Sequence, residues 1–440
     1  MSRTHLHIVL ACATGLVVGS ASAAEPLAIT GAKVHSLGDA GTLDRATVLI
    51  RDGKIAALGP KLSVSDDTHR IEGKGKVVTP GLFDALSDLG TEEVELVAGT
   101  VDSAAESAHL GAAFDITGAI NPRSTLFPIN RIEGVTRAMV APTSPSAWLS
   151  TPEGSLFAGQ GSIVHLAAAT DVILKPRAAL FVTLGEHGAD FAGGSRAGTL
   201  GQLREALEDA QAWAALPEAQ QAVANPGYAI RRPARAVLLQ ALSGDLPMVA
   251  RVNRASDIRA VLDLSEAFGL RLIIAGGTEA WMLADALAQA SVPVILDPTA
   301  NLPANFEQLG ARADAAAILH RAGVLIAITQ DGESHQSRNI RQLAGNAVAH
   351  GLDWDAALAA ITINPAKIYR LNHAQSGVMP GQRAHAVVWS GDPLELTTAA
   401  EAVIIEGRLQ SMTSRQTLLR DRYLKRDDPW PPAYRRPSSP

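Results

Sequence analysis

Alternating apolar and polar positions fill the first region of the chain, residues 27–78, and recur near its other end. This alternation is typical of half-buried strands, and it predicts strands at residues 28–34, 47–51, 54–59, 386–389 and 402–408. The Asp52-Gly53 pair between two apolar runs indicates a β-hairpin. Because neither region is long enough to build a core alone, we expect both to join in one composite β-sandwich domain.

Between these regions, short aliphatic runs alternate with stretches of helical periodicity. The runs predict strands at residues 77–78, 136–140, 179–184, 248–252, 270–274, 292–296 and 324–328. The helical pattern predicts helices at residues 200–215, 255–268, 278–290, 311–321 and 336–350. Near-continuous aliphatic strands separated by amphipathic helices favour a parallel sheet. So many units predict an α/β fold built on a closed (β/α)8 TIM-type barrel.

The first residues have the pattern of a secretory signal peptide. An apolar stretch at residues 8–18 is followed by Ala21-Ser22-Ala23, a small-x-small cleavage pattern. We therefore expect a periplasmic or secreted protein. The expected organisation is a signal peptide at 1–23, a composite β domain at 24–78 plus 376–412, a barrel at 79–375, and a polar, Pro-rich tail at 413–440 that is extended or disordered.

Composition excludes several classes of function. The net charge of -6 and an aromatic content of 4% argue against a nucleic-acid partner. The one cysteine, Cys12, lies in the predicted signal peptide, so thiolate catalysis and disulfides are not expected in the mature chain. After that peptide, no apolar run approaches the roughly 20 residues of a membrane span. A small-molecule ligand or substrate is the expected partner.

Several motifs resemble the amidohydrolase superfamily. Residues 78–85, Val-Thr-Pro-Gly-Leu-Phe-Asp-Ala, resemble its opening barrel strand, and residues 50–55 resemble its N-terminal hairpin. Residues 360–367, 377–381 and 387–394 resemble its C-terminal end. The resemblance is strongest to imidazolonepropionase-like and dipeptidase-like members. It implies a hydrolase acting on carbon–nitrogen bonds other than peptide bonds, with one or two divalent metals that activate water.

Most positions that carry metal-binding histidines in this family carry other residues here. The His-x-His of the first strand corresponds to Leu86-Ser87-Asp88, and the His-Ala-His-Arg of the fifth strand corresponds to Arg-Val-Asn-Arg, which begins at Arg251 and includes Asn253. A histidine of the sixth strand corresponds to Gly276. Leucine has no lone pair in its side chain, glycine has no side chain, and a guanidinium is permanently protonated, so none of the three can bind a metal ion.

Three carboxylates remain as candidate metal ligands. They are Asp88, Glu186 in a Gly-Glu-His turn, and Asp331 after the eighth strand. The resemblance implies that Asp331 is both a ligand and the catalytic base. Arg251 would occupy the place of a metal and repel one. We therefore expect no cofactor, or one divalent cation for which an oxygen-only shell favours magnesium, calcium or manganese over the zinc usual in the family.

The sequence leaves three hypotheses open. The first is a catalytically silent pseudoenzyme that binds a small ligand in a site lined by Arg251, Asn253, His187 and His335. Such a protein could instead pair with an active relative or with itself. The second is a hydrolase with a rebuilt site based on Asp331. The third is a structural or interaction module of the cell envelope, which would use the Pro-rich tail or an outer helix face.

Overall fold

The computed structural model describes residues 25–105, 107, 109–145, 154–221, 232–330, 334–371 and 377–424. The predicted signal peptide, the end of the tail after residue 424 and the candidate base Asp331 lie outside these described residues.

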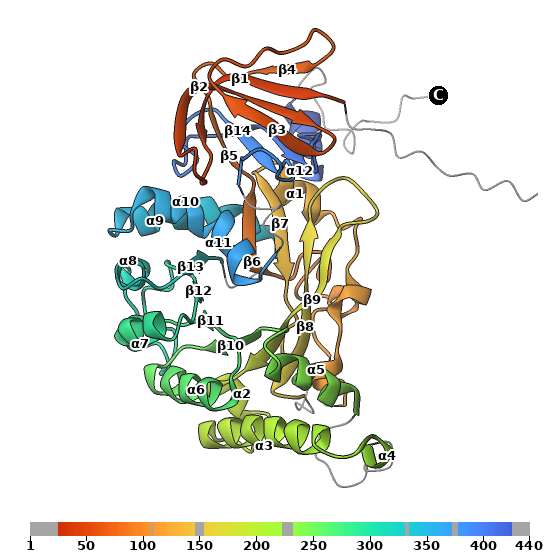
Figure 1. The fold of residues 1–440 in the computed structure, drawn as a ribbon, viewed down its shortest axis with the longest axis vertical. Coiled ribbons are helices and arrows are strands. Elements are labelled where there is room, and N and C mark those ends of the chain that lie inside the picture. Colours follow the sequence, from red (N-terminus) through yellow and green to blue (C-terminus); the bar gives the residue numbers. More distant parts are fainter. Residues whose placement is uncertain are drawn as a thin grey trace, which may run out of the picture.

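Strands from both ends of the chain share one eight-stranded sheet (Figure 1). The N-terminal part contributes β1 (Leu27–His35), β2 (Thr42–Arg51), β3 (Lys54–Gly59), β4 (His69–Glu72) and β5 (Val77–Pro80), and the C-terminal part contributes β14 (Ala386–Trp389), β15 (Ala400–Ile405) and β16 (Arg408–Leu409). The order is β16-β15-β14-β5-β1-β2-β3, with β4 beside β1. The two ends meet where β14 pairs antiparallel with β5, with Val388 opposite Val78. Both valines are fully buried, so joining the ends completes an apolar core that neither end has alone.

A second eight-stranded sheet forms the barrel. Its strands, in spatial order, are β13 (Ile326–Ile328), β12 (Val294–Leu296), β11 (Leu272–Gly276), β10 (Met248–Val252), β9 (Ile173–Thr183), β8 (Phe157–His165), β7 (Val135–Val140) and β6 (Leu82–Ser87). The expected α/β barrel is confirmed, but β8 runs antiparallel to both of its neighbours. The apolar pattern does not reveal β8, because Gly159 and Gly161 interrupt it. Gly159 has φ +126°, and a Cβ there would lie 2.7 Å from the carbonyl oxygen of Phe114.

Helices cover the outside of the barrel (Figure 1). The described helices are α1 (Leu126–Arg131), α2 (Gly185–Ala189), α3 (Arg196–Ala214), α4 (Glu218–Gln221), α5 (Arg232–Leu242), α6 (Ala255–Phe268), α7 (Ala284–Gln289), α8 (Ala315–Arg321), α9 (Ile340–Ala349), α10 (Trp354–Ala360), α11 (Ile363–Ile368) and α12 (Arg415–Leu424). Five 3₁₀ segments are described: η1 (Ala98–Thr100), η2 (Gly111–Ala113), η3 (Ile116–Ala119), η4 (Ala280–Leu283) and η5 (Ser334–Asn339). The predicted helix 255–268 is α6, which ends at Gly269 in the left-handed region.

Two predictions about helices need correction. The helix expected over residues 278–290 is divided into η4 and α7. The tail, expected to be extended or disordered, begins with the helix α12. Ser414 and Thr417 cap this helix reciprocally, since each backbone N–H donates to the other hydroxyl. None of the helices in the described ranges is both long enough and apolar enough to cross a bilayer.

Candidate functional site

Near the end of β6, an apolar side chain lies inside the barrel, and a carboxylate follows directly after the strand. Leu86 is buried in the apolar interior of the barrel. Asp88 follows the strand and is half-buried, and its Oδ1 accepts a hydrogen bond from the Ser334 hydroxyl at the start of η5. This contact brings the loop after the last barrel strand to the end of the first, at the edge where barrel enzymes place their sites.

Asp84 lies deeper, inside β6, and is fully buried. Its Oδ1 lies 2.5 Å from the hydroxyl of Thr329, which follows β13, and 3.4 Å from the backbone nitrogen of Leu86. Burial raises the pKa of Asp84 to about 7, although the hydroxyls of Ser337 and Thr329 oppose this rise. Asp84 therefore links the first and last strands and is near its protonation midpoint at neutral pH.

Arg251 occupies the end of β10, in register with Ala275 of β11 and Thr183 of β9. Its guanidinium carbon lies 6.0 Å from the centroid of the Phe181 ring, at the limit of a cation–π contact. The neighbouring Tyr369 is fully buried, and its hydroxyl donates to the carbonyl oxygen of Ala85 at 2.8 Å. The barrel interior beneath the candidate site is therefore occupied by a guanidinium and aromatic rings.

Asn253 fills the space at the end of β11. Its Oδ1 accepts a 3.0 Å hydrogen bond from the Thr278 hydroxyl, and the backbone nitrogen of Thr278 is 3.4 Å away. Gly276 ends the strand with φ +85°, and a Cβ on it would lie 2.6 Å from Asn253 Oδ1. Position 276 therefore holds no side chain for two reasons: its backbone conformation is strained for L-residues, and the Asn253 amide stands in the way.

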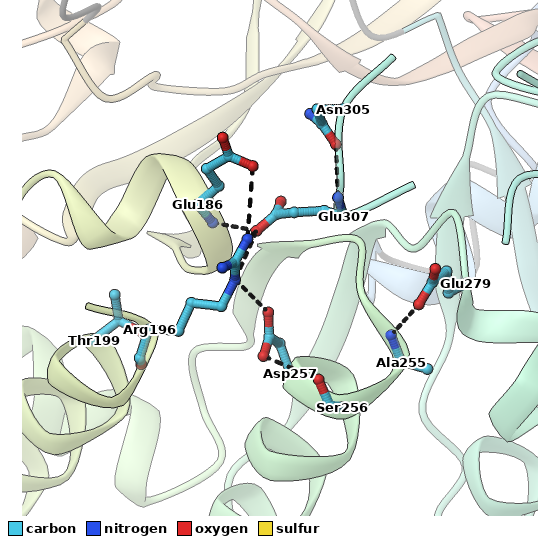
Figure 2. A network of polar contacts seen from close by, with 9 residues as sticks. All are labelled: Glu186, Arg196, Thr199, Ala255, Ser256, Asp257, Glu279, Asn305 and Glu307. Atoms are coloured by element: carbon cyan, nitrogen blue, oxygen red, sulfur yellow. Dashed lines mark hydrogen bonds and ion pairs between the residues drawn. The ribbon is translucent and has the colours of Figure 1, made fainter. Parts of the chain in front are cut away.

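Glu279 ties the next loop to the barrel. Its Oε2 accepts from the backbone nitrogen of Ala255, the first residue of α6, at 2.8 Å (Figure 2). Its Oε1 accepts from the backbone nitrogen of Gly310 at 2.9 Å. This buried carboxylate therefore caps a helix and holds the loop after β12, as an acid at a positive helix end does.

Glu186 belongs to a separate charged cluster around Arg196 (Figure 2). The guanidinium lies 3.0 Å from Glu307, 3.3 Å from Asp257 and 3.6 Å from Glu186. Glu307 Oε1 also accepts from the backbone nitrogen of Glu186. One cation thus joins α2, α6 and the loop after β12, and the Glu186 carboxylate contacts Arg196, with no contact to Asp88 among the described residues.

The two candidate histidines lie apart from each other. His187 is half-exposed in α2, with Nδ1 3.8 Å from Asp190 and its ring 5.5 Å from that of Phe191. His335 lines a cavity of about 280 Å³ together with Ser334, Glu92 and Glu93. Its position next to Ser334 places it near Asp88.

Comparison with known proteins finds similarity to one family. An amidohydrolase family model matches residues 256–417. The crystal structure of an amidohydrolase from Thermotoga maritima MSB8 is 25% identical, with a TM-score of 0.76, over 87% of this chain and 99% of that chain. Residues 256–417 thus match the amidohydrolase family, and the chain as a whole has the fold of an amidohydrolase structure.

Two more distant hydrolase structures share the fold. The structure of molinate hydrolase is 14% identical, with a TM-score of 0.51, over 89% of this chain and 95% of that chain. The structure of phenylurea hydrolase B is 14% identical, also with a TM-score of 0.51, over 88% of this chain and 97% of that chain. No curated protein matches the chain.

The structure describes only part of the candidate metal site, since Asp331 lies outside the described residues. Within the described ranges, no three His, Cys, Asp or Glu side chains gather in a group that could hold a metal ion. The catalytic assignment of Asp331 lies outside those ranges and stays a prediction, as do the ligand assignments of Asp88 and Glu186.

Sequence reasoning missed four residues that organise this end of the barrel: Thr329, Ser334, Arg196 and Glu307. Thr329 stands directly after a predicted strand, and that position could have marked it. Arg196 and Glu307 are separated by more than a hundred residues, and no local pattern relates them.

Proposed function

We propose that this amidohydrolase-fold protein binds a small polar molecule at the carboxyl end of its barrel and does not carry out the usual zinc-dependent hydrolysis. The proposal rests mainly on one observation. Asn253 Oδ1 lies 2.6 Å from where a Cβ on Gly276 would be, at the position that corresponds to a family metal ligand. A histidine at 276 would have to displace the amide and adopt a strained backbone.

The chemistry of the neighbouring strand ends supports the same conclusion. Leu86 is apolar, and Arg251 carries a fixed positive charge that repels a divalent cation. Asp84 is engaged with Thr329, and burial favours its neutral form. The described residues therefore do not fit a binuclear zinc centre, which requires several imidazole and carboxylate lone pairs.

The same residues suit the recognition of a polar ligand. Arg251 supplies a planar fork of donors that matches a carboxylate or a carbonyl group. Asn253, which directly follows the same strand, offers an amide, and His335 lines a cavity together with Ser334, whose hydroxyl contacts Asp88. His187 would line the site only from its outer edge, since it is half-exposed on α2. A small carboxylate or amide compound is the class of ligand that we expect.

Elemental analysis tests this proposal. The protein should be purified without a chelator and without metal-affinity resin, and its zinc content measured by mass spectrometry. We expect far less than one zinc per chain, and the same low zinc content after dialysis against zinc. One zinc or more per chain, lost in Asp88→Asn, would refute the proposal.

A hydrolase with one oxygen-liganded cation is the second candidate, favoured by the position of Asp88 at the barrel edge beside Ser334. In that case Asp88 or Glu186 would hold magnesium, calcium or manganese, and Asp331 would act as the base. Asp331→Asn would then abolish turnover of cyclic amides or dipeptide-like compounds. Asp66→Asn, a change at a fully exposed carboxylate, is the matched control.

A further inference from the structure

The C-terminal helix α12 is attached to the barrel at its first turn. The reciprocal cap of Ser414 and Thr417 fixes where the helix begins. The guanidinium of Arg338, in η5, donates to Gln416 Oε1 at 2.8 Å. The helix lies beside α1 at the surface of the molecule (Figure 1). Its start is therefore held in place, while the rest extends along the surface.

Beyond that first turn, α12 exposes apolar side chains. None of its ten residues is buried, and Leu418 and Tyr423 are each 60% exposed. At 3.6 residues per turn, Leu418, Leu419 and Tyr423 fall within an arc of about 140°. Arg415 and Arg422 lie inside the same arc. Single exposed leucines are ordinary, but here three exposed apolar side chains and two arginines share one side of a helix that buries none of its residues.

The charge of this part of the chain indicates what the surface contacts. Residues 411–440 carry seven Lys or Arg against three Asp, whereas the whole chain has a net charge of -6. The same residues include Tyr423, Trp430 and Tyr434, and aromatic residues favour the membrane–water interface. Helices that lie in the surface of a bilayer use apolar and aromatic side chains to enter it and Lys or Arg side chains to contact anionic lipids.

We propose that α12 docks this protein onto an anionic phospholipid surface. Leu418, Leu419 and Tyr423 enter the boundary between headgroups and acyl chains, and Arg415 and Arg422 contact lipid phosphates. The long arginine stems allow this, because they lie along apolar surface while the charged ends reach the phosphates. An acidic protein surface would satisfy the charges but would leave the apolar arc without apolar neighbours. This inference does not depend on what the barrel binds.

Vesicle co-sedimentation of the purified chain tests the proposal. We expect binding to phosphatidylcholine vesicles that contain phosphatidylglycerol, little binding to phosphatidylcholine alone, and weaker binding as salt rises. Arg415→Gln and Arg422→Gln should each weaken binding about fivefold. The double variant Leu418→Ser/Tyr423→Ser should weaken it further at every salt concentration. Leu96→Ser, a change at a leucine that is 93% exposed on a barrel loop, is the control and should bind like the wild type.

Three results would overturn the proposal: equal binding to both kinds of vesicle, variants in α12 that bind as the wild type does, or a wild-type dimer in sedimentation velocity that these variants convert to a monomer. The last result would assign the surface to a second copy of the chain. Circular dichroism of the variants checks that they fold, which is expected because the altered side chains are exposed.

Discussion

The hydroxyl of Thr329 lies 2.5 Å from Asp84 Oδ1 and 2.9 Å from the carbonyl oxygen of Leu86. Asp84 belongs to the first strand of the barrel and Thr329 directly follows the last. The sheet order begins at one of these strands and ends at the other, so this side-chain contact joins the two edges. Asp84 can take part while fully buried because burial favours its neutral form.

Replacing Asp84 with Asn should remove a pH dependence of stability. The pKa of Asp84 is raised from 3.8 to about 7 by burial. Its contribution to stability is therefore fully present below about pH 4 and is lost as the pH rises through about 7. In Asp84→Asn the amide stays neutral, so urea unfolding should show a flatter profile in this range and a gain of roughly 1–3 kcal/mol above it. If the free energy of unfolding depends on pH in the same way in Asp66→Asn and in Asp84→Asn, this explanation is wrong.

His385 should produce the opposite pH dependence. Burial lowers the pKa of His385 from 6.5 to about 4, although the hydrogen bond with Glu406 at 2.9 Å opposes this effect. The neutral ring is favoured in the folded state, so this stability is present above about pH 6.5 and is lost as the pH falls toward about 4. His385→Gln can still donate to Glu406, and its free energy of unfolding should fall less between these pH values. His69→Gln, a change at an exposed histidine, should leave the loss of unfolding free energy at acid pH unchanged.

Adding a methyl group at Gly276 should lower the free energy of unfolding by more than backbone strain alone would. Gly276 and Gly244 both have positive φ, +85° and +76°, but a Cβ on Gly244 meets nothing within 4 Å. Gly244→Ala should therefore cost about 1 kcal/mol of unfolding free energy. Gly276→Ala should cost about 3 kcal/mol, because the collision with Asn253 adds to the strain. If Asn253→Ala does not recover part of the difference in a double-mutant cycle, the amide is not the obstacle.

Removing the cation from the Arg196 cluster should destabilise the loop after β12. Arg196→Met leaves Glu307, which is nearly buried, and Asp257 without their shared positive charge. We expect a loss of about 3 kcal/mol in chemical unfolding and faster proteolysis near Glu307. Arg204→Met breaks an exposed pair with Glu208, 3.9 Å apart, and removes a cation–π contact at 5.7 Å from the Phe268 ring centroid, and should cost less than about 1 kcal/mol. Similar losses in both variants would show that the cluster has no special role.

Local patterns predicted much of the fold and little of the candidate site. Helix α6 was predicted with its observed bounds, since its apolar periodicity ends at Gly269. Strand β8 was missed because its glycines respond to neighbours distant in sequence, such as Phe114 beside Gly159. The motif comparison identified Gly276 as a departure from the family, but it gave no reason for the departure.

By itself, the sequence determined the resemblance to a family, the barrel, and the pairing of both chain ends in one sheet, because hydrophobic periodicity and short motifs are local properties. Only the tertiary structure decided that Asn253 fills the place beside Gly276, that Thr329 meets Asp84, and that Arg196 engages Glu186. These contacts join residues on different strands and loops. Their energies depend on distances of a few ångströms and on exclusion from water, which folding alone establishes.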